Sequence, residues 1–271
     1  MGEALVITSG KGGVGKSTLA ANLAMALADN GQKVVLIDAD TGLRNLDVLL
    51  GMENRVVYDL TDVAEGVCRL KQALVKDEHN ANLCLIAAAQ MRDSASVSPA
   101  QMEKIVTKLK TMFDWVIVDC PAGVDRGFRT AVAGVDRAII VALNDVVSLR
   151  DAERVRTLLE KIGLARPMLV CNRITEEKLK RGEAPAWTRM AERLELELLG
   201  VTPEDSAVRQ AAQSGVPVVK GRSPSAQAFK RIARRLCGEA VEIEYGKRQG
   251  IMDWFRGRSR RGSHNEVSHA K

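Results

Sequence analysis

The sequence predicts an α/β fold in which a mostly parallel, twisted sheet is flanked by helices on both faces. Short apolar runs alternate with helical segments along the chain, which is typical of strands joined by crossover helices. A glycine-rich stretch, residues 10–17, lies between an apolar run and an alanine-rich segment and fits the phosphate-binding pattern G-x-x-x-x-G-K-[ST]. Acids also follow two of the apolar runs, at the strand ends where open parallel sheets bind ligands.

The glycine-rich stretch follows a predicted buried strand, residues 5–8, and precedes a predicted helix, residues 18–29. Glycines let backbone N–H groups surround phosphate oxygens, and a helix N-terminus adds partial positive charge there. We expect Lys16 to contact the β- and γ-phosphates and the Ser17 hydroxyl to bind Mg²⁺. The stretch therefore supplies a set of predicted ATP-binding residues: Gly10, Lys11, Gly12, Gly13, Val14, Gly15, Lys16, Ser17 and Thr18.

Lys11 occupies a position that the general pattern leaves open. A lysine at the start of the loop cannot easily turn back onto the phosphates beside Lys16. It could instead contact the nucleotide of a second copy of the protein. The residue alone favours the plainer alternative, a solvated surface lysine.

Three acids stand at predicted strand ends. A strand over residues 33–37 runs into Asp38 and Asp40, and a strand over residues 113–118 is closed by Asp119. Asp119 fits the Walker B acid that supplies a carboxylate to Mg²⁺. Asp40 is expected to orient the attacking water and Asp38 to act near Mg²⁺ through water. The alternative for both acids is that they cap the following loop or helix. Gly123, in the next turn, can offer a backbone N–H to the γ-phosphate.

Two later strand ends are candidates for adenine binding. A strand over residues 168–171 ends at Asn172 and Arg173, and one over residues 198–201 precedes Pro203. A side-chain amide can pair with a donor and an acceptor on adenine, although Asn is also a common turn residue.

Further strands are predicted over residues 83–87 and 137–142. Helical segments are predicted over residues 59–65, 71–74, 99–112 and 223–237, and residues 144–151 lead into another helix that ends at about residue 162.

Composition agrees with one large α/β domain. The chain has 271 residues, of which 46% are hydrophobic and 27% charged, as in soluble globular proteins. A transmembrane helix is not expected because no run of 18 apolar residues occurs, and a strand beginning near residue 4 leaves no room for a secretion signal. The five cysteines are scattered, with no C-x-x-C spacing, so we expect a reducing cytoplasm and no zinc site or disulfide.

The C-terminal tail has a different character. Seven basic against three acidic residues give residues 243–271 a net charge of +4, which leaves +2 for residues 1–242. Helical spacing places four apolar residues on one face with basic residues around them, which is typical of an interfacial helix on anionic lipid. An ordinary core helix is the alternative. The predicted membrane residues are Ile251, Met252, Trp254, Phe255, Lys247, Arg248 and Arg256.

These observations divide the chain into three parts. We expect an ATPase domain over residues 1–240, an amphipathic membrane-targeting tail over residues 241–258, and a disordered extension over residues 259–271.

The chain resembles the deviant Walker A ATPases of the ParA/MinD family, and among them the branch that regulates division-site placement. The similarity spans roughly residues 2–255. Partition ATPases, iron–sulfur carriers and nitrogenase reductases share the glycine-rich loop, whereas residues 42–47 and 55–59 are much more specific to the division-site branch. The matching stretches are residues 10–17, 38–47, 55–59, 72–77, 119–123 and 148–151.

The resemblance implies a Mg²⁺-dependent ATPase that dimerises on binding ATP. Each Lys11 would then contact the phosphates of the other subunit, so that hydrolysis depends on dimerisation. Asp40 would position the water, and Asp151 would lie on the surface used by partners. The implied partners are a division inhibitor of the MinC type, a topological regulator of the MinE or another type, and the anionic inner face of the cytoplasmic membrane, to which the protein would bind peripherally.

Other members of the wider family remain as alternatives. A partition-type ATPase would bind DNA through a basic surface, which the +2 balance of residues 1–242 and the apolar tail disfavour, so nucleic acid is not expected as a partner. A regulator of flagellar number usually carries an activating N-terminal segment, for which this sequence leaves no room. An iron–sulfur carrier would need paired cysteines.

Overall fold

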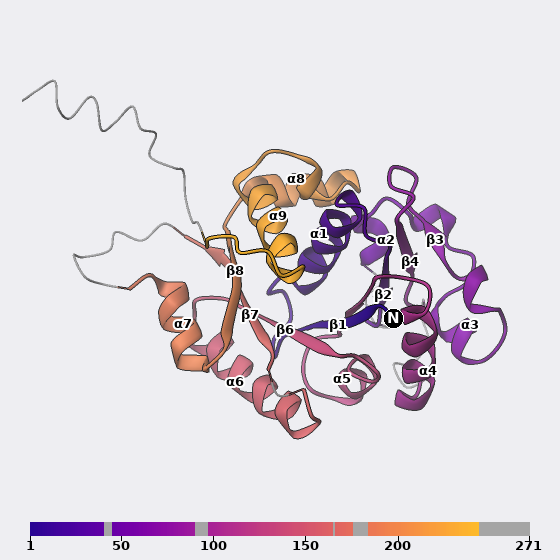
Figure 1. Ribbon diagram of the computed structural model, residues 1–271, viewed down its shortest axis with the longest axis horizontal. Helices are drawn as coiled ribbons and strands as arrows, with labels where there is room; N and C mark the ends of the chain where they lie inside the picture. Colours follow the sequence, from indigo (N-terminus) through magenta and orange to yellow (C-terminus); the bar gives the residue numbers. More distant parts are fainter. Residues whose placement is uncertain (41–44, 90–96, 165, 176–183, 244–271) are drawn as a thin grey trace, which may run out of the picture.

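The computed structural model describes residues 1–40, 45–89, 97–164, 166–175 and 184–243. Within these residues the strands form a single sheet that lies between two layers of helices (Figure 1). The strands are β1 (Glu3–Thr8), β2 (Val34–Asp38), β3 (Val75–Lys76), β4 (Leu83–Ile86), β5 (Trp115–Asp119), β6 (Arg137–Ala142), β7 (Met168–Ile174) and β8 (Glu197–Pro203).

The sheet has the order β3-β4-β2-β5-β1-β6-β7-β8, so β1 lies in its middle between β5 and β6. All pairings are parallel except that of β3 with β4, which is antiparallel at the sheet edge. The mostly parallel sheet predicted from the sequence is therefore confirmed. The parallel register also sets Asp38 of β2 directly beside Asp119 of β5.

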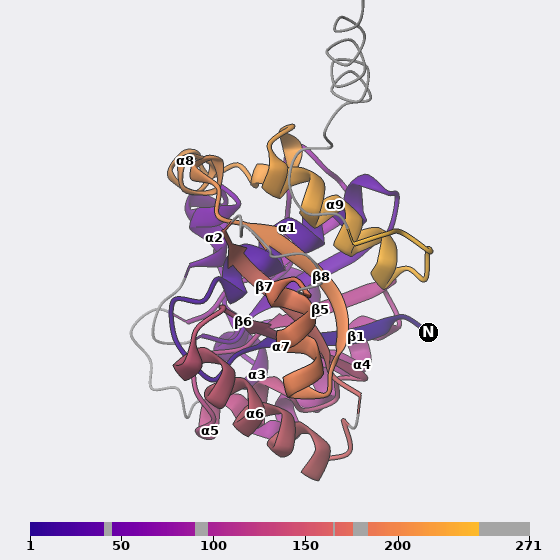
Figure 2. The same ribbon diagram turned by 90° about the vertical axis from the view of Figure 1, so that its left-hand side faces the viewer.

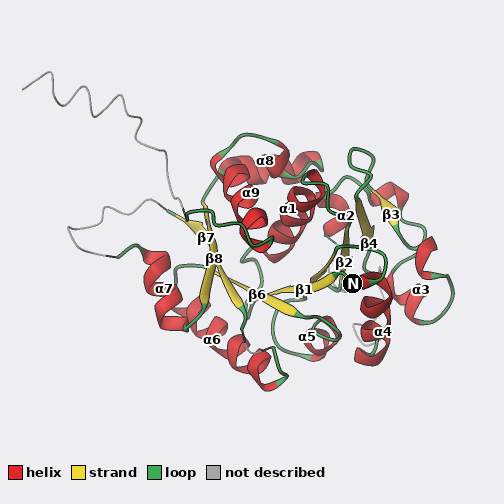
Figure 3. Ribbon diagram, in the orientation of Figure 1, coloured by secondary structure: helices red, strands yellow, loops and turns green. Residues whose placement is uncertain are grey.

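Both faces of the sheet are buried, as the continuous apolar strands require. Along β1, Leu5 and Ile7 belong to one core, and Ala4 and Val6 belong to the other. The first core is covered by α1 (Lys16–Asp29), α2 (Leu46–Leu49), α8 (Ser206–Ser214) and α9 (Pro224–Leu236). The second is covered by α3 (Leu60–Ala64), α4 (Pro99–Lys110), α5 (Arg126–Ala131), α6 (Val146–Lys161) and α7 (Ala186–Leu194). Figures 2 and 3 show the two helix layers on opposite sides of the strands.

Several helices begin at residues whose side chains satisfy free backbone N–H groups. Ser98 caps α4 in a reciprocal pair with Gln101, with Pro99 at the first helical position. Asp145 accepts a hydrogen bond from the Ser148 N–H at the start of α6. Local sequence therefore fixes where these helices start, and their apolar faces then fix which core they cover.

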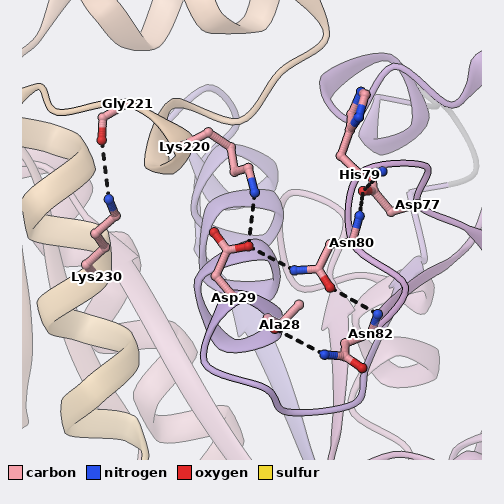
Figure 4. Close-up of polar contacts among 9 residues, drawn as sticks. All are labelled: Ala28, Asp29, Asp77, His79, Asn80, Asn82, Lys220, Gly221 and Lys230. Carbon is pink, nitrogen blue, oxygen red and sulfur yellow. Dashed lines mark hydrogen bonds and ion pairs between the residues drawn. The ribbon is translucent and has the colours of Figure 1, made fainter.

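The C-terminal end of α1 is tied to two distant segments (Figure 4). Asp29 Oδ1 accepts hydrogen bonds from Asn80 Nδ2 at 2.9 Å and from Lys220 Nζ at 3.0 Å. Asn80 lies in the turn between β3 and β4, and Lys220 ends a short 3₁₀ helix, η3 (Val218–Lys220). Deeper along α1, Asn22 Oδ1 accepts the Val219 N–H at 2.9 Å. These contacts hold α1 in place, with its N-terminus at the glycine-rich loop.

Some elements were not predicted from the sequence. The short helices α2 and α5 and the edge strand β3 are too short to show a periodic pattern. The helices α7 and α8 are strongly amphipathic and were missed although their sequences carry the helical pattern. The segment predicted to be helical over residues 71–74 is a 3₁₀ turn, η2 (Leu70–Gln72), and another 3₁₀ turn, η1 (Glu53–Arg55), follows α2. The predicted ends of two strands were wrong, because β7 continues to Ile174 and β8 to Pro203.

The extra length of β7 and β8 comes from irregular pairing. The register between them shifts near Leu169 and again between Cys171 and Ile174, and Arg173 has a left-handed backbone conformation with φ 52°. Pro203 is tolerated because β8 is an edge strand, where a missing N–H breaks no ladder. Asn172 and Arg173 therefore lie inside an irregular strand rather than after it.

No helix among the described residues is long and apolar enough to cross a membrane. The predicted membrane residues 247–256, the tail boundary at 258 and the extension over residues 259–271 all lie outside the described residues, as do Gly42–Arg44 of the family-like stretch.

The packing of α9 on β8 depends on a glycine. A Cβ atom on Gly200 would lie 2.3 Å from Ile232 Cγ1 and 2.9 Å from its Cδ1. Ile232 is fully buried and, as a β-branched residue in a helix, has little rotamer freedom. The helix can approach the strand this closely only because Gly200 has no side chain.

We therefore expect Gly200→Ala to destabilise the fold by about 1–3 kcal/mol through overpacking. The measurement is the thermal midpoint, in a double-mutant cycle with Ile232→Ala. Gly200→Ala should cost much less in the Ile232→Ala background. Equal costs in both backgrounds would show that the strand and helix do not meet as described.

Candidate functional site

The glycine-rich loop connects the end of β1 to the start of α1. Gly13 and Gly15 have φ values of 75° and 100°, in the left-handed region where a side chain is strained. Gly15 is the N-cap of α1, and no side chain accepts a hydrogen bond there. The first backbone N–H groups of α1 thus remain available for an anion, and the helix dipole favours negative charge at the same place.

The first turn of α1 carries Lys16, Ser17 and Thr18. Lys16 is buried, and Ser17 is half-buried and hydrogen-bonds to the carboxyl group of Asp119 at the end of β5. Asp119 is also buried, and its Oδ1 atom has no hydrogen-bond partner. A buried carboxylate oxygen normally has a partner, so this atom is suited to receive a ligand.

Asp119 and Asp38 influence each other across the sheet. Burial, with the charge of Asp38 next, raises the pKa of Asp119 to about 8, although Ser17 and Lys16 oppose the shift. Burial also raises the pKa of Asp38, to about 6, and this shift is opposed by hydrogen bonds from backbone N–H groups. A cation bound between the strand ends would relieve the desolvation of both groups.

Asp38 shapes the loop after β2. Its carboxyl oxygens accept the N–H groups of Asp40 at 3.0 Å, Asn45 at 3.3 Å and Leu46 at 3.2 Å. Asp38 therefore caps the loop, which was one of the two roles predicted for it; the other was a role near Mg²⁺. Asp40 is half-buried in the same loop, and its charge contributes to the raised pKa of Asp119. The predicted water-positioning residue therefore lies in the same cluster as Asp119.

Two further predicted residues surround the loop. Gly123, after β5, is half-buried with φ 90°. Lys11 is exposed, and its backbone carbonyl accepts a hydrogen bond from Ser9 Oγ at 2.7 Å. A Cβ atom on Gly10 would lie 2.5 Å from that of Asp151 in α6. The start of the loop, next to the exposed Lys11, thus rests directly on α6.

A cavity of about 410 Å³ adjoins the other end of the loop. It brings together the three predicted adenine contacts, Asn172, Arg173 and Pro203, with Gly15 and Thr18. The rest of the wall was not predicted from the sequence. Asp is a residue type typical of helix N-caps, and Asp205 does cap α8, with its side chain accepting the Ala207 N–H. The additional lining residues are Glu204, Asp205, Ser206, Val208, Arg209, Ala212, Ser225 and Phe229.

The residues fit a magnesium ion shared with a nucleotide. Mg²⁺ is usually bound by one or two carboxylates, water and substrate phosphates. Among the described residues no group of three or more His, Cys, Asp or Glu side chains could form a closed metal cage, but Ser17 and Asp119 converge beside the phosphate loop, with Asp38 next to them. The orphaned Asp119 Oδ1 is the observation that favours this fit.

A strand–loop–helix cradle with a buried lysine, a hydroxyl and an acid at a neighbouring strand end defines a P-loop ATPase. A family model described as "ParA: NUBPL iron-transfer P-loop NTPase" matches residues 1–237. The septum site-determining protein MinD of Bacillus subtilis is 46% identical over 247 residues, which cover 90% of this chain and 92% of that protein.

Solved structures agree with these matches. MinD in the MinC:MinD cell division complex of Aquifex aeolicus has a TM-score of 0.82 and 42% identity, covering 90% of this chain and 98% of that one. MinD of Pyrococcus horikoshii, solved with Mg-ADP, has a TM-score of 0.78 and 31% identity, covering 87% of this chain and 96% of that one.

The chain belongs to the MinD family of septum-site-determining ATPases, within the wider ParA group. The family resemblance inferred from the sequence is confirmed, and the partition and flagellar alternatives are not favoured.

The pKa of Asp119 gives a testable dependence of stability on pH. Its folded value of about 8 lies above the unfolded value of 3.8, so the folded state binds more protons between these two pH values. The free energy of unfolding of the nucleotide-free protein should fall as pH rises from about 4 to 8.

Asp119→Asn removes this buried ionisable group and should stabilise the nucleotide-free protein at pH 8, by on the order of 1–3 kcal/mol. The gain should shrink toward pH 5, and stabilisation by Mg²⁺ with nucleotide should be lost. Thermal midpoints across pH measure both effects, with Glu103→Gln on the exposed face of α4 as the charge control. Parallel pH profiles for wild type and Asp119→Asn would contradict the assignment.

Proposed function

We propose that this protein binds ATP with Mg²⁺ as a homodimer, hydrolyses it, and recruits a division inhibitor to the membrane to regulate where the septum forms. The observation that carries the proposal is the convergence of buried Lys16, Ser17 and the orphaned Asp119 Oδ1 on the glycine-rich loop. The Mg-ADP complex of the Pyrococcus relative and the MinC:MinD complex of the Aquifex relative support it.

We assign the chemical roles as follows. Lys16 and the N–H groups of the loop and α1 bind the β- and γ-phosphates, and Gly123 donates its N–H to the γ-phosphate. Ser17 and Asp119 bind Mg²⁺, which neutralises phosphate charge, and Asp38 adds a contact through water. Asp40 orients the water that attacks the γ-phosphorus as the bond to the ADP oxygen breaks. Asn172, Arg173 and Pro203 contact the adenine in the cavity beside Gly15.

Lys11 acts across the dimer interface in this proposal. It is exposed, unlike the buried Lys16, although both stand on the same loop. An exposed cation at the rim of a phosphate site is free to meet the phosphates of a second subunit, where it stabilises transition-state charge as an arginine finger does. Hydrolysis then requires dimerisation, because one subunit alone lacks this charge.

Partner binding is assigned to the surface of α6 near the loop. Asp151 lies against Gly10, so a protein bound at Asp151 would be close to the part of the loop that carries Lys11. We propose a MinC-type inhibitor as one partner, with a topological regulator of the MinE or another type as a second.

Membrane attachment is assigned to the tail over residues 241–258, with the protein peripheral on the inner face of the cytoplasmic membrane. Full burial of Ile251, Met252, Trp254 and Phe255 would contribute roughly 1.5–3 kcal/mol each, but an interfacial helix buries them only partly. Ordering about ten residues costs about 1–2 kcal/mol apiece, and basic residues near anionic lipid return about 1 kcal/mol each. The ordering cost offsets most or all of the two gains, so a single tail binds weakly.

A dimer carries two tails, and this raises avidity by roughly 10²–10⁴-fold. Membrane affinity should therefore follow the nucleotide state, high for the ATP dimer and low for the ADP monomer. The basic tail also matches an anionic surface.

Lys11→Ala should leave nucleotide binding largely intact but remove the ATP dimer and the hydrolysis coupled to it. Sedimentation velocity with ATP, together with phosphate release, measures both. Lys104→Ala, which removes an exposed lysine from α4, is the matched control and should behave as wild type. A stable ATP dimer of Lys11→Ala with normal turnover would contradict the role in trans.

Truncation before Lys247, or Trp254→Glu combined with Phe255→Glu, should abolish binding to anionic vesicles while ATP binding persists. The measurement is co-sedimentation with vesicles in ATP and in ADP. Val67→Glu, at an exposed apolar residue of the folded domain, serves as the control and should still bind. Equal binding in the two nucleotides, or undiminished binding by the truncated chain, would refute the mechanism.

A further inference from the structure

The amide of Asn172 makes more contacts than a turn residue or a free base-binding residue would. Its Nδ2 atom donates to the Val14 carbonyl of the glycine-rich loop at 2.6 Å. Its Oδ1 atom accepts the Arg173 N–H at 3.0 Å and also the hydroxyl of Thr202. Asn172 therefore bridges β7, β8 and the loop, and it still lines the cavity beside Gly15.

The main-chain partners fix the orientation of this amide. The Val14 carbonyl can only accept and the Arg173 N–H can only donate. A flipped amide would set oxygen against oxygen and N–H against N–H. The Gly15 backbone also depends on this arrangement, because a Cβ atom there would lie 2.3 Å from Asn172 Nδ2.

Thr202 decides what the oriented amide can still offer. An amide oxygen has two acceptor sites, and the Arg173 N–H and the Thr202 hydroxyl occupy both. One Nδ2 hydrogen remains without a partner among the residues that the structure describes. Thr202 is itself buried, with 1% of its surface exposed, so its hydroxyl has no bulk water to bond instead.

We propose that Thr202 is a positioning residue that limits base discrimination at Asn172 by making its side-chain amide a donor only. The inference deepens the proposed nucleotide-binding function and rests on it. A donor-only amide reads an acceptor on the base, such as N7, which adenine shares with hypoxanthine. It cannot accept from the 6-amino group, the feature that distinguishes adenine from a 6-oxo purine. The Asn172 contact therefore contributes little discrimination between the two bases.

The test compares the affinities of ADP and IDP in the presence of Mg²⁺, which avoids turnover. Calorimetry gives the ratio of the IDP to the ADP dissociation constant. Thr202→Val frees one acceptor site on Asn172 Oδ1, which can then accept from the adenine 6-amino group. The ratio should rise about three- to tenfold, the effect of one hydrogen bond. Thr202→Ser keeps the hydroxyl and should retain the wild-type ratio.

Control variants distinguish a change in base specificity from a general loss of nucleotide affinity caused by structural damage. Thr130, in α5, is another buried threonine, and its hydroxyl donates a hydrogen bond to the Val97 carbonyl. Thr130→Val removes that hydroxyl and should leave the ratio unchanged. A purely structural loss would weaken ADP and IDP equally. If Thr202→Val does not fold, Thr202→Ala carries the same expectation.

Two outcomes overturn the proposal in distinguishable ways. A wild-type ratio in Thr202→Val or Thr202→Ala, with ADP still bound, would show that Thr202 does not limit base discrimination and would leave the proposed function intact. Failure of the wild-type protein to bind either nucleotide would remove the proposed function and this inference with it.

Discussion

The parallel pairing of β2, β5 and β1 is the constraint on which the site depends. It sets Asp38 beside Asp119, and Asp119 beside the end of the strand that leads into the glycine-rich loop. Because the strand interiors are buried on both faces, the acids are desolvated, and the pKa of each is raised. A bound cation would relieve that desolvation, so the fold itself favours Mg²⁺ held together with a nucleotide.

The helices that cover the first core hold the glycine-rich loop in place beside the strand ends. Polar contacts at Asp29 and Asn22 tie α1 to the β3–β4 turn and to η3. The partly exposed ion pair between Asp29 and Lys220 contributes little to stability, but together with the buried hydrogen bond of Asn22 it fixes where α1 lies. The opposite end of the helix presents Lys16 and Ser17, so a well-anchored helix gives the phosphate cradle a defined position.

The two ends of the glycine-rich loop contact different neighbours. Gly10 rests on Asp151 of α6, the surface to which we assign partners, and the Val14 carbonyl accepts a hydrogen bond from Asn172 at the cavity to which we assign the base. The missing Cβ atoms of Gly10 and of Gly15, the residue after Val14, permit these close approaches. The loop is therefore in physical contact with the proposed partner surface at its start and with the base cavity at its end.

Much of this protein is determined by its sequence alone, because the signals are local. The glycine pattern needs only backbone freedom, the apolar runs need only burial, and the acids at the ends of β2 and β5 follow their strands directly. The family resemblance came from the same stretches. The short helices α2 and α5 could not be predicted in this way, because they are too short to show a helical period. The helices α7 and α8 do carry an amphipathic pattern and were missed in spite of it.

Only the tertiary structure decided how the distant residues work together. Asp38 binds three backbone N–H groups of its loop, an interaction that sequence reasoning could name only as one of two alternatives. The bonds of Asn172 to Val14 and Thr202 join residues 158 and 30 positions apart, and no local pattern records such pairs. Composition and spacing determine which groups a chain possesses, whereas packing determines which hydrogen bonds those groups still have free.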